Sequence, residues 1–264
     1  MKPPFSYYGG KQSIVHHLIK CLPMHTVYVE PFAGSAALFH AKPKPAVVNS
    51  QHYREVINDL DGELINFFRC LRDHNEELCR QLSLTLYSRE EFVDSQILID
   101  DDPITRARKF LIRIACTFSG KSSGKWWRIG KLAGSHPATL SKRIEMIPSY
   151  VSRLRGVYMD SDSASSVIRR WDSPSTLFYC DPPYPSADQS GYHFAFTMGD
   201  MEKLVALLNN ADGASVVSAY GNCDHLFGND WARYQINVTA SCIYPQKTEA
   251  DRQRTEWVWV RLNR

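Results

Sequence analysis

The sequence lacks the long apolar segments and the cysteine patterns that mark several protein classes. No stretch of its 264 residues approaches the eighteen or more apolar residues of a membrane span, and the opening MKPPFSYYGGKQ has no apolar signal-peptide core. The seven cysteines form no CxxC pair and no regular spacing, so neither a zinc knuckle nor a disulfide framework is indicated. We therefore expect a globular protein that is neither secreted nor membrane-bound, with reduced thiols and no metal.

Net charge is also small, but it is unevenly distributed. The formal value of +3 does not by itself indicate a nucleic-acid partner. Residues 106–155, however, hold twelve Lys and Arg against the single acid Glu145, so the rest of the chain is acidic. The same region contains a glycine-, serine- and lysine-rich run at 119–128, typical of a flexible loop. We predict an inserted subdomain at 72–155, flanked by two parts of one domain, 1–71 and 156–264.

Strand and helix patterns alternate on both sides of this segment. Short apolar runs predict strands at 27–29, 55–58, 156–159, 176–180 and 215–218. Helical spacing predicts helices at 35–39, 62–71, 104–118 and 200–210. Residues 240–244 and 257–262 are typical of an antiparallel pair joined by the charged loop 246–255. Because strand, loop and helix follow one another without an internal repeat, the fold class is α/β with an open, doubly wound sheet.

The sharpest local feature is Asp181-Pro182-Pro183-Tyr184, directly after the strand pattern at 176–180. In open α/β sheets, ligands bind at the carboxyl ends of strands. The two prolines stiffen the turn, so Asp181 and the Pro182 carbonyl can accept both hydrogens of an amino group while Tyr184 stacks on a planar base. Adenine fits this description, although a plain surface turn explains the same four residues equally well when they are taken alone.

Three further segments are typical of a site for a nucleoside-containing cofactor without a pyrophosphate. The turn from Glu30 to Gly34 lacks the GxGxxG dinucleotide fingerprint, but its small residues permit close approach of a ligand. Asp59 ends the second strand, where an acid reaches ribose hydroxyls. Tyr7 precedes two glycines and Lys11, which can neutralise a carboxylate. The structural alternatives are sheet–helix packing, a solvated loop acid and an N-terminal arm packed on the core.

In this order, residues 5–11, 28–38, 58–59 and 181–184 resemble the Dam-type family of DNA adenine N6-methyltransferases, the alpha group of the amino-methyltransferases. The resemblance covers both ends of the chain, and its specificity comes from the order of the segments. It implies transfer of a methyl group from S-adenosylmethionine to the exocyclic amino group of a flipped-out adenine in duplex DNA. It also implies a class I, Rossmann-like methyltransferase fold with a mixed sheet, an antiparallel C-terminal strand and an inserted, mostly helical target-recognition subdomain.

The resemblance also implies a role for each matching residue. Lys11 faces the methionine carboxylate of the cofactor, Asp59 holds the ribose, and Tyr184 stacks on the target base. The implied cofactor contacts are Tyr7, Lys11, Glu30, Pro31, Phe32, Ala33, Gly34, Asp59 and Asp181, and the implied catalytic residues are Asp181, Pro182, Pro183 and Tyr184. The chain departs from the family after the third strand, where Ser163 replaces the usual acid toward the cofactor adenine; we expect Asp162 to substitute.

The basic segment lies where the family carries its target-recognition region. From it we expect DNA contacts by Lys121, Lys125, Trp126, Trp127, Arg128 and Lys131, through phosphates or as wedges between bases. The alternative is a solvated basic face with buried tryptophans. We further expect a cytoplasmic enzyme of a bacterial or phage-infected cell; whether a cognate restriction enzyme exists is not decided by the sequence.

Two other functions share these features. A methyltransferase for adenine in RNA or for glutamine in protein needs a similar turn of acid or amide, two prolines and an aromatic residue, and substrate choice distinguishes it. A DNA-binding protein that has lost turnover would bind DNA without methyl transfer. The complete Asp181 to Tyr184 turn and the presence of Lys11 favour an enzyme.

Overall fold

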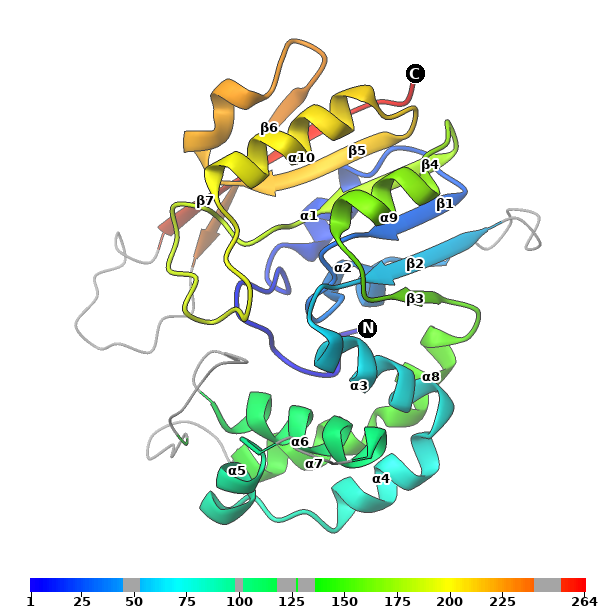
Figure 1. Cartoon of the computed structure of the whole chain (residues 1–264), viewed down its shortest axis with the longest axis vertical. Coiled ribbons are helices and arrows are strands. Elements are labelled where there is room, and N and C mark those ends of the chain that lie inside the picture. The colour runs from blue at the N-terminus through cyan, green and yellow to red at the C-terminus, as the bar shows by residue number, and fades with distance from the viewer. Residues whose placement is uncertain (45–52, 98–101, 118–126, 128–135, 240–252) are drawn as a thin grey trace.

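A seven-stranded mixed sheet forms the centre of the molecule (Figure 1). The structure is a computed structural model that describes residues 1–44, 53–97, 102–117, 127, 136–239 and 253–264. The strands are β1 (Val27–Glu30), β2 (Arg54–Asn58), β3 (Tyr158–Asp160), β4 (Thr176–Cys180), β5 (Ala214–Ala219), β6 (Ala232–Thr239) and β7 (Gln253–Arg261). The helices are α1 (Val15–Lys20), α2 (Ala37–Ala41), α3 (Gly62–Asp73), α4 (Asn75–Ser83), α5 (Arg89–Asp94), α6 (Pro103–Cys116), α7 (His136–Glu145), α8 (Ile147–Leu154), α9 (Ala164–Trp171), α10 (Met198–Asn210) and the 3-10 helix η2 (Gly221–Leu226).

The strand order is β3-β2-β1-β4-β5-β7-β6. β1 lies between β2 and β4, because Val29 pairs in parallel register with both Val56 and Phe178. The order of the chain reverses between β1 and β4, and open α/β sheets bind ligands at such a switch point, outside the carboxyl ends of the strands. β7 runs antiparallel to β5 and β6. The predicted α/β fold with a mixed sheet and an antiparallel C-terminal strand is therefore confirmed.

The partner of the last strand differs from the prediction. β7 pairs with β6 at 232–239, upstream of the expected 240–244, and residues 240–252 lie outside the described residues. β6 is the edge strand of the sheet, and Tyr234 on it is 47% exposed. Its apolar residues Ala232, Tyr234, Ile236 and Val238 alternate with polar ones, which is the pattern of a half-buried strand, and sequence reasoning missed it.

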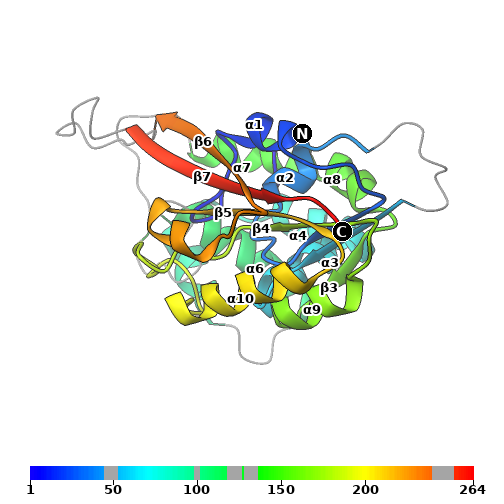
Figure 2. The ribbon, with the colours of Figure 1, turned by 90° about the horizontal axis from the view of Figure 1, so that it is seen from above.

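The two faces of the sheet are covered by different helices. Tyr28, Ile57 and Leu177 belong to a core shared with α1, α2, α3, α4, α6, α7 and α8. Val29 and Phe178 pack instead in a second core with α9 and α10 on the opposite face (Figure 2). Strands buried on both faces appear as continuous apolar runs, which is why β1 and β4 were recognisable from sequence.

Polar side chains set the starts of the helices that border the carboxyl ends of the strands. Asp61 accepts hydrogen bonds from two first-turn amides of α3, and Ser163 accepts one from the first turn of α9. α10 begins with a reciprocal capping box between Thr197 and Asp200. Three helix N-termini, each with partial positive charge, therefore lie at this end of the sheet.

Helices α4, α5, α6 and α7 lie beyond α3, at the end of the molecule nearest β3 (Figure 1). α6 is the central element of this layer and packs against α3, α4 and α5. We propose that these helices form the inserted subdomain predicted for residues 72–155. Within the described part of the chain, no helix is long and apolar enough to cross a membrane.

Candidate active site

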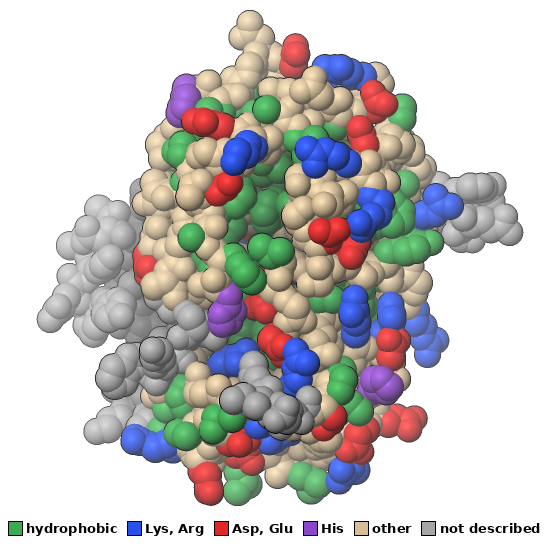
Figure 3. Space-filling model, in the orientation of Figure 1, with side chains coloured by type: hydrophobic (Ala, Val, Ile, Leu, Met, Phe, Trp, Pro, Cys, Tyr) green, Lys and Arg blue, Asp and Glu red, His purple; other side chains and the backbone are tan. Residues whose placement is uncertain are grey.

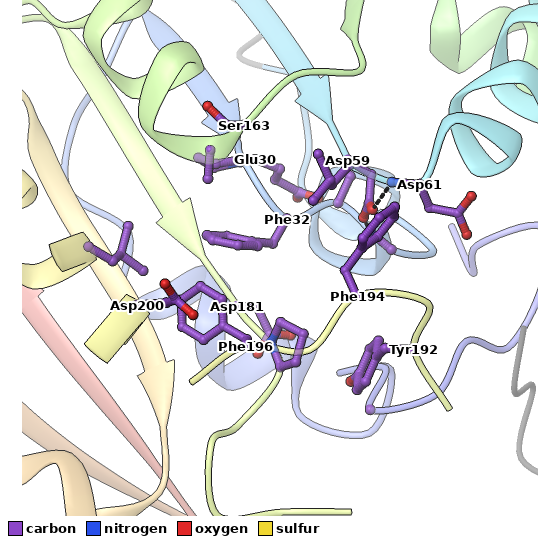
Figure 4. A pocket seen from close by; sticks show the side chains of 18 of the residues that line it. Glu30, Phe32, Asp59, Asp61, Ser163, Asp181, Tyr192, Phe194, Phe196 and Asp200 are labelled. Atoms are coloured by element: carbon purple, nitrogen blue, oxygen red, sulfur yellow. Dashed lines mark hydrogen bonds between the residues drawn. The ribbon is translucent and has the colours of Figure 1, made fainter. Parts of the chain in front are cut away.

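A cavity of about 820 Å³ opens at the carboxyl ends of β1, β2 and β4. It extends from Lys11 and Asp181 to the groove between α9 and α10, and its volume lies in the range of small-molecule and cofactor sites, about 300–1,000 Å³. Figure 3 shows hydrophobic side chains gathered in a hollow at the centre of this face. In Figure 4, side chains from the strand ends meet the aromatic side chains of loop 185–197 across the cavity.

The sequence-predicted cofactor residues are brought together here. All ten line the cavity: Tyr7, Lys11, Glu30, Pro31, Phe32, Ala33, Gly34, Asp59, Asp162 and Asp181. Pro183 of the predicted catalytic turn and Ser163 line it as well. Two members of the predicted catalytic turn do not line it, because Pro182 and Tyr184 are buried behind its wall. Among the described residues, no group of three His, Cys, Asp or Glu could hold a metal ion.

The turn after β1 is held by the end of β2. Asn58 donates from its amide nitrogen to the Pro31 carbonyl at 2.9 Å, and the Gly34 amide donates to Asp59 Oδ2 at 2.9 Å. Gly34 has φ +48°, and a Cβ there would lie 3.1 Å from the Tyr7 ring. A left-handed residue packed this closely against an aromatic ring favours glycine, so the single glycine of the motif has a defined structural reason.

Asp59 is engaged by backbone groups rather than solvated. Its other carboxylate oxygen accepts from the Asp61 amide at 3.0 Å. Burial raises the pKa of Asp59 to about 6, although these amides oppose the shift. A carboxylate accepts up to about four hydrogen bonds, so Asp59 retains capacity toward a cavity ligand.

Glu30 is 1% exposed at the inner end of the cavity. Its Oε1 accepts from the Tyr28 hydroxyl at 2.6 Å and from the Phe39 amide of α2 at 2.7 Å. Burial nevertheless raises the pKa of Glu30 to about 7. Because the folded state holds its proton more tightly than the unfolded chain does, this group lowers stability progressively as pH rises from about 4.5 to 7.

Glu30→Gln is therefore expected to gain stability relative to the wild type as pH rises. The carboxamide oxygen can keep both hydrogen bonds but cannot ionise. The difference in the free energy of unfolding should grow by about 2–3 kcal/mol in favour of the variant between pH 5 and pH 8. Urea unfolding of both proteins at the two pH values measures it, and a difference that is constant with pH would contradict the raised pKa.

Lys11 and Asp181 form a buried ion pair on the cavity wall. The Lys11 Nζ to Asp181 Oδ1 distance is 2.9 Å, and Lys11 is 7% exposed. Burial alone would lower the pKa of Lys11, but Asp181 and then Glu256 outweigh it and raise the pKa. Burial raises the pKa of Asp181, and the attraction of Lys11 offsets this rise only in part. Two positions that are far apart in the sequence thus share one electrostatic environment.

Tyr184 is 8% exposed, and protein groups surround its ring. Lys11 Nζ lies 4.6 Å from the ring centroid, and Tyr220 packs edge-on at 4.5 Å. The Tyr184 hydroxyl donates to Glu256 Oε2 at 2.7 Å. A base can therefore stack on Tyr184 only if Lys11 or Tyr220 moves away from the ring.

Sequence reasoning missed the loop between the catalytic turn and α10. Gln189 ties its two ends, donating to the carbonyls of Tyr184 at 3.1 Å and Phe196 at 2.8 Å. Phe196 packs edge-on against Phe32 at 5.6 Å on the cavity wall. The aromatic-rich run Gly191-Tyr192-His193-Phe194-Ala195-Phe196 directly after the catalytic turn was the signal that could have identified this wall.

The same loop is clasped by the N-terminal arm. The Tyr192 hydroxyl donates to the Tyr8 carbonyl at 3.1 Å, and the Tyr8 hydroxyl donates to the Asp188 carbonyl at 3.0 Å. Gly9 has φ +74°, and a Cβ there would lie 2.3 Å from the Tyr192 hydroxyl oxygen. Residues 7–11 of the N-terminal arm therefore line the cavity. The alternative drawn from the sequence was an arm that only packs on the core.

Asp162 and Ser163, which follow β3, have different contacts. Asp162 lines the cavity and forms an ion pair with Arg170 at 2.9 Å. The hydrogen bond from the Ser163 amide and then the Arg170 contact lower the pKa of Asp162, so its carboxyl is ionised at neutral pH. Ser163 caps α9. Of the two, only Asp162 carries an acidic side chain at the position where the chain departs from the family pattern, and that side chain is paired with Arg170.

The predicted DNA contacts fall largely outside the described residues. This applies to Lys121, Lys125, Trp126, Arg128 and Lys131. Trp127 is described; it is partly buried and packs on a small core with Phe92 and Ile112. That position matches the alternative of a packed tryptophan for this residue.

Many described basic side chains of the segment are committed within the protein. Arg106 pairs with Glu63, Arg108 with Glu91, and Lys109 with Asp94. Arg113 is 5% exposed, and Arg153 pairs with Glu55. The net positive charge of residues 106–155 therefore overstates the charge available to phosphates, because acids elsewhere in the chain neutralise these side chains.

Known methyltransferases are similar to this chain over most of its length. A type II methyltransferase of Lactococcus lactis subsp. cremoris is 25% identical over 241 residues, covering 84% of this chain and 81% of the relative. A DNA adenine methylase of Escherichia coli is 22% identical over 242 residues, covering 84% and 81%. An rRNA methylase structure from Streptococcus thermophilus is 10% identical, covers 95% of this chain and 94% of that one, and has a TM-score of 0.37, too low to support an argument.

The family model for D12 class N6 adenine-specific DNA methyltransferases matches residues 7–231. This span contains Tyr7 and Lys11, the turn from Glu30 to Gly34, Asp59 and the turn at Asp181. The chain belongs to the D12 class N6 adenine-specific DNA methyltransferase family.

Proposed function

We propose that this protein transfers the methyl group of S-adenosylmethionine to the exocyclic amino nitrogen of a flipped-out adenine in duplex DNA. The observation that carries the proposal is the position of Asp181. This residue directly follows β4, lines the 820 Å³ cavity and begins the Asp-Pro-Pro-Tyr turn. This is where an amino group and a cofactor can meet at the switch point of the sheet.

The cavity fits a sulfonium nucleoside carrying an amino acid. Asp59 lies at the end of β2 for the ribose hydroxyls, and Phe32 with Phe196 forms an apolar wall for a planar base. Asp162 would face the adenine edge of the cofactor. Lys11 would hold the methionine carboxylate, exchanging its present partner Asp181 for it. When bound, this cofactor supplies an activated methyl group.

The chain's own part in the reaction is to orient the target amine. The amino lone pair of adenine is delocalised into the ring, so two acceptors directed at its hydrogens favour the geometry in which the nitrogen can react. We assign these acceptors to the Asp181 carboxylate and the Pro182 carbonyl, with Pro183 keeping the turn rigid. Catalysis then depends on positioning and preorganised electrostatics.

DNA binding is assigned to the basic segment, through Lys121, Lys125, Trp126, Arg128 and Lys131. Trp127 is supported less, because its side chain packs on Phe92 and Ile112. Base extrusion is required because the amino group is otherwise committed to pairing. A cytoplasmic location in a bacterial or phage-infected cell agrees with such a substrate.

The experiment is tritium transfer from labelled S-adenosylmethionine to mixed-sequence duplex DNA, followed by nucleoside digestion. We expect the label in N6-methyladenine. Parallel reactions with RNA and with peptides test the competing substrates. Label on cytosine would overturn the base assignment, label on RNA or peptide alone would overturn the DNA assignment, and DNA binding without label would indicate a protein that has lost turnover.

A further inference from the structure

Glu256 approaches the catalytic turn from a strand outside the motifs that identified the site. It lies on β7 opposite Ile236 of β6 and is partly buried. Because side chains alternate along a strand, Glu256 lies on the same face as Val258 and Val260, which belong to the core on the Tyr179 side of the sheet. A carboxylate at the edge of an apolar core requires a partner.

That partner is the Tyr184 hydroxyl, 2.7 Å from Glu256 Oε2. The other acceptor near this hydroxyl, Asp181 Oδ1, lies at 3.4 Å, so the stronger hydrogen bond goes to Glu256. At the opposite end of the residue, the Tyr184 carbonyl accepts from Gln189 at 3.1 Å. Tyr184 is thus held at its backbone by its own loop and at its tip by β7.

We propose that Glu256 is a positioning residue for methyl transfer, which fixes the orientation of the Tyr184 ring through its hydroxyl and so the face that the target base meets. The inference rests on the proposed function. A hydrogen bond to an ionised acceptor is short and stronger than a neutral one. An error of about 1 Å in the placement of a reacting group can reduce a rate about 100-fold, so the ring needs an anchor beyond its own loop.

The arrangement also explains why an aromatic residue with a hydroxyl stands at the end of the turn. The ring contacts to Lys11 and Tyr220 would be available to phenylalanine as well. Only the hydroxyl reaches Glu256, and it links the carboxyl end of β4 to β7 across 72 residues of sequence. A tyrosine can therefore stack on the target base with its ring while its hydroxyl is anchored to β7.

The test compares kcat, the KM for S-adenosylmethionine and the thermal midpoint in Glu256→Ala, Glu256→Gln and Thr255→Ala. Glu256→Ala should lower kcat about tenfold or more without changing the cofactor KM. Glu256→Gln should recover most of that loss, because its carboxamide oxygen can accept the same hydrogen bond. Thr255→Ala is the matched control, since Thr255 is the preceding residue of β7 and lies on the opposite face.

A double-mutant cycle with Tyr184→Phe identifies the path of the effect. Tyr184→Phe should lose as much as Glu256→Ala, and the double variant should be no slower than either single one. Losses that multiply, or a Glu256→Gln variant as slow as Glu256→Ala, would overturn the inference. If Glu256→Ala does not fold, full activity of Tyr184→Phe would overturn it equally.

The two proposals fail differently. A wild-type protein that transfers no methyl group to DNA would overturn the proposed function and this inference with it. An active wild type with a fully active, folded Glu256→Ala would overturn only the role of Glu256.

Discussion

Asp181→Ala is expected to lower methyl transfer to duplex DNA at least about 100-fold, the scale seen when one preorganised polar group is removed from an active site. Asp181 is the acidic acceptor at the carboxyl end of β4 that lines the cavity beside the Pro-Pro-Tyr turn. Without it, one amino hydrogen loses its acceptor, and Lys11 is left as a buried cation with Glu256 as the remaining nearby acid. Both effects act on the reacting geometry.

The measurement is steady-state tritium incorporation, with DNA binding measured separately. We expect DNA affinity to change much less than turnover, because the phosphate contacts are assigned to the basic segment and not to Asp181. Asp230→Ala is the control: Asp230 is an exposed aspartate in the turn before β6, away from the cavity. Turnover of Asp181→Ala within tenfold of the wild type would refute its role.

Glu55→Gln is expected to destabilise the protein by about 3–5 kcal/mol, the cost of breaking a buried ion pair by removing one partner. Glu55 has a side chain only 2% exposed, and it contacts Lys42 Nζ at 3.0 Å and Arg153 Nη1 at 2.5 Å. Arg153 also donates to the Phe39 carbonyl and lies over the Phe39 ring. The substitution would leave two buried cations without their acid.

The dependence on pH separates this effect from that of Glu30. Burial alone would raise the pKa of Glu55, but Arg153 and Lys42 together lower it. Its stabilisation is therefore complete above the unfolded pKa of about 4.5 and is lost as pH falls through the lower folded value. Urea unfolding should show a large difference from the wild type at pH 7 that narrows in acid. A difference that persists unchanged in acid would contradict the charged pairing.

Glu77→Gln provides the matched comparison. Glu77 pairs with Arg80 on the surface of α4, where both side chains are largely exposed. Water and salt screen such pairs, so the thermal midpoint should not move measurably. Glu55 thus has a structural role that its residue type alone does not reveal, since it joins β2 to α8 of the helical layer.

Much of the fold was predictable because its signals are local. The parallel strands are buried on both faces, so β1, β2 and β4 appear as apolar runs close to their observed bounds. The helices predicted at 62–71 and 104–118 from apolar spacing are observed at 62–73 and 103–116. β6 carries a local signal as well, an alternation of apolar and polar residues over 232–239, which the prediction of a strand at 240–244 overlooked.

The net charge of residues 106–155 predicted less about the structure than the strand and helix patterns did. Counting Lys and Arg over 106–155 predicted a surface for phosphates, whereas Arg106, Arg108 and Arg153 are neutralised by acids on other elements. A residue count along the chain cannot identify the acid that a helix brings to each cation, because the pairing depends on packing. Only contacts in space distinguish a solvated basic face from an internal ion-pair network.

Local signals in the sequence were enough to predict the α/β alternation, the turn at Gly34 and the placement of Asp59 and Asp181 at strand ends, because periodicity and turn residues act over a few residues. Tertiary structure alone decided that Lys11 faces Asp181 and that Tyr184 faces Glu256. These contacts join the N-terminal arm, the end of β4 and the C-terminal strand. The physical reason is that sheet order, not sequence distance, brings those segments to one end of the molecule.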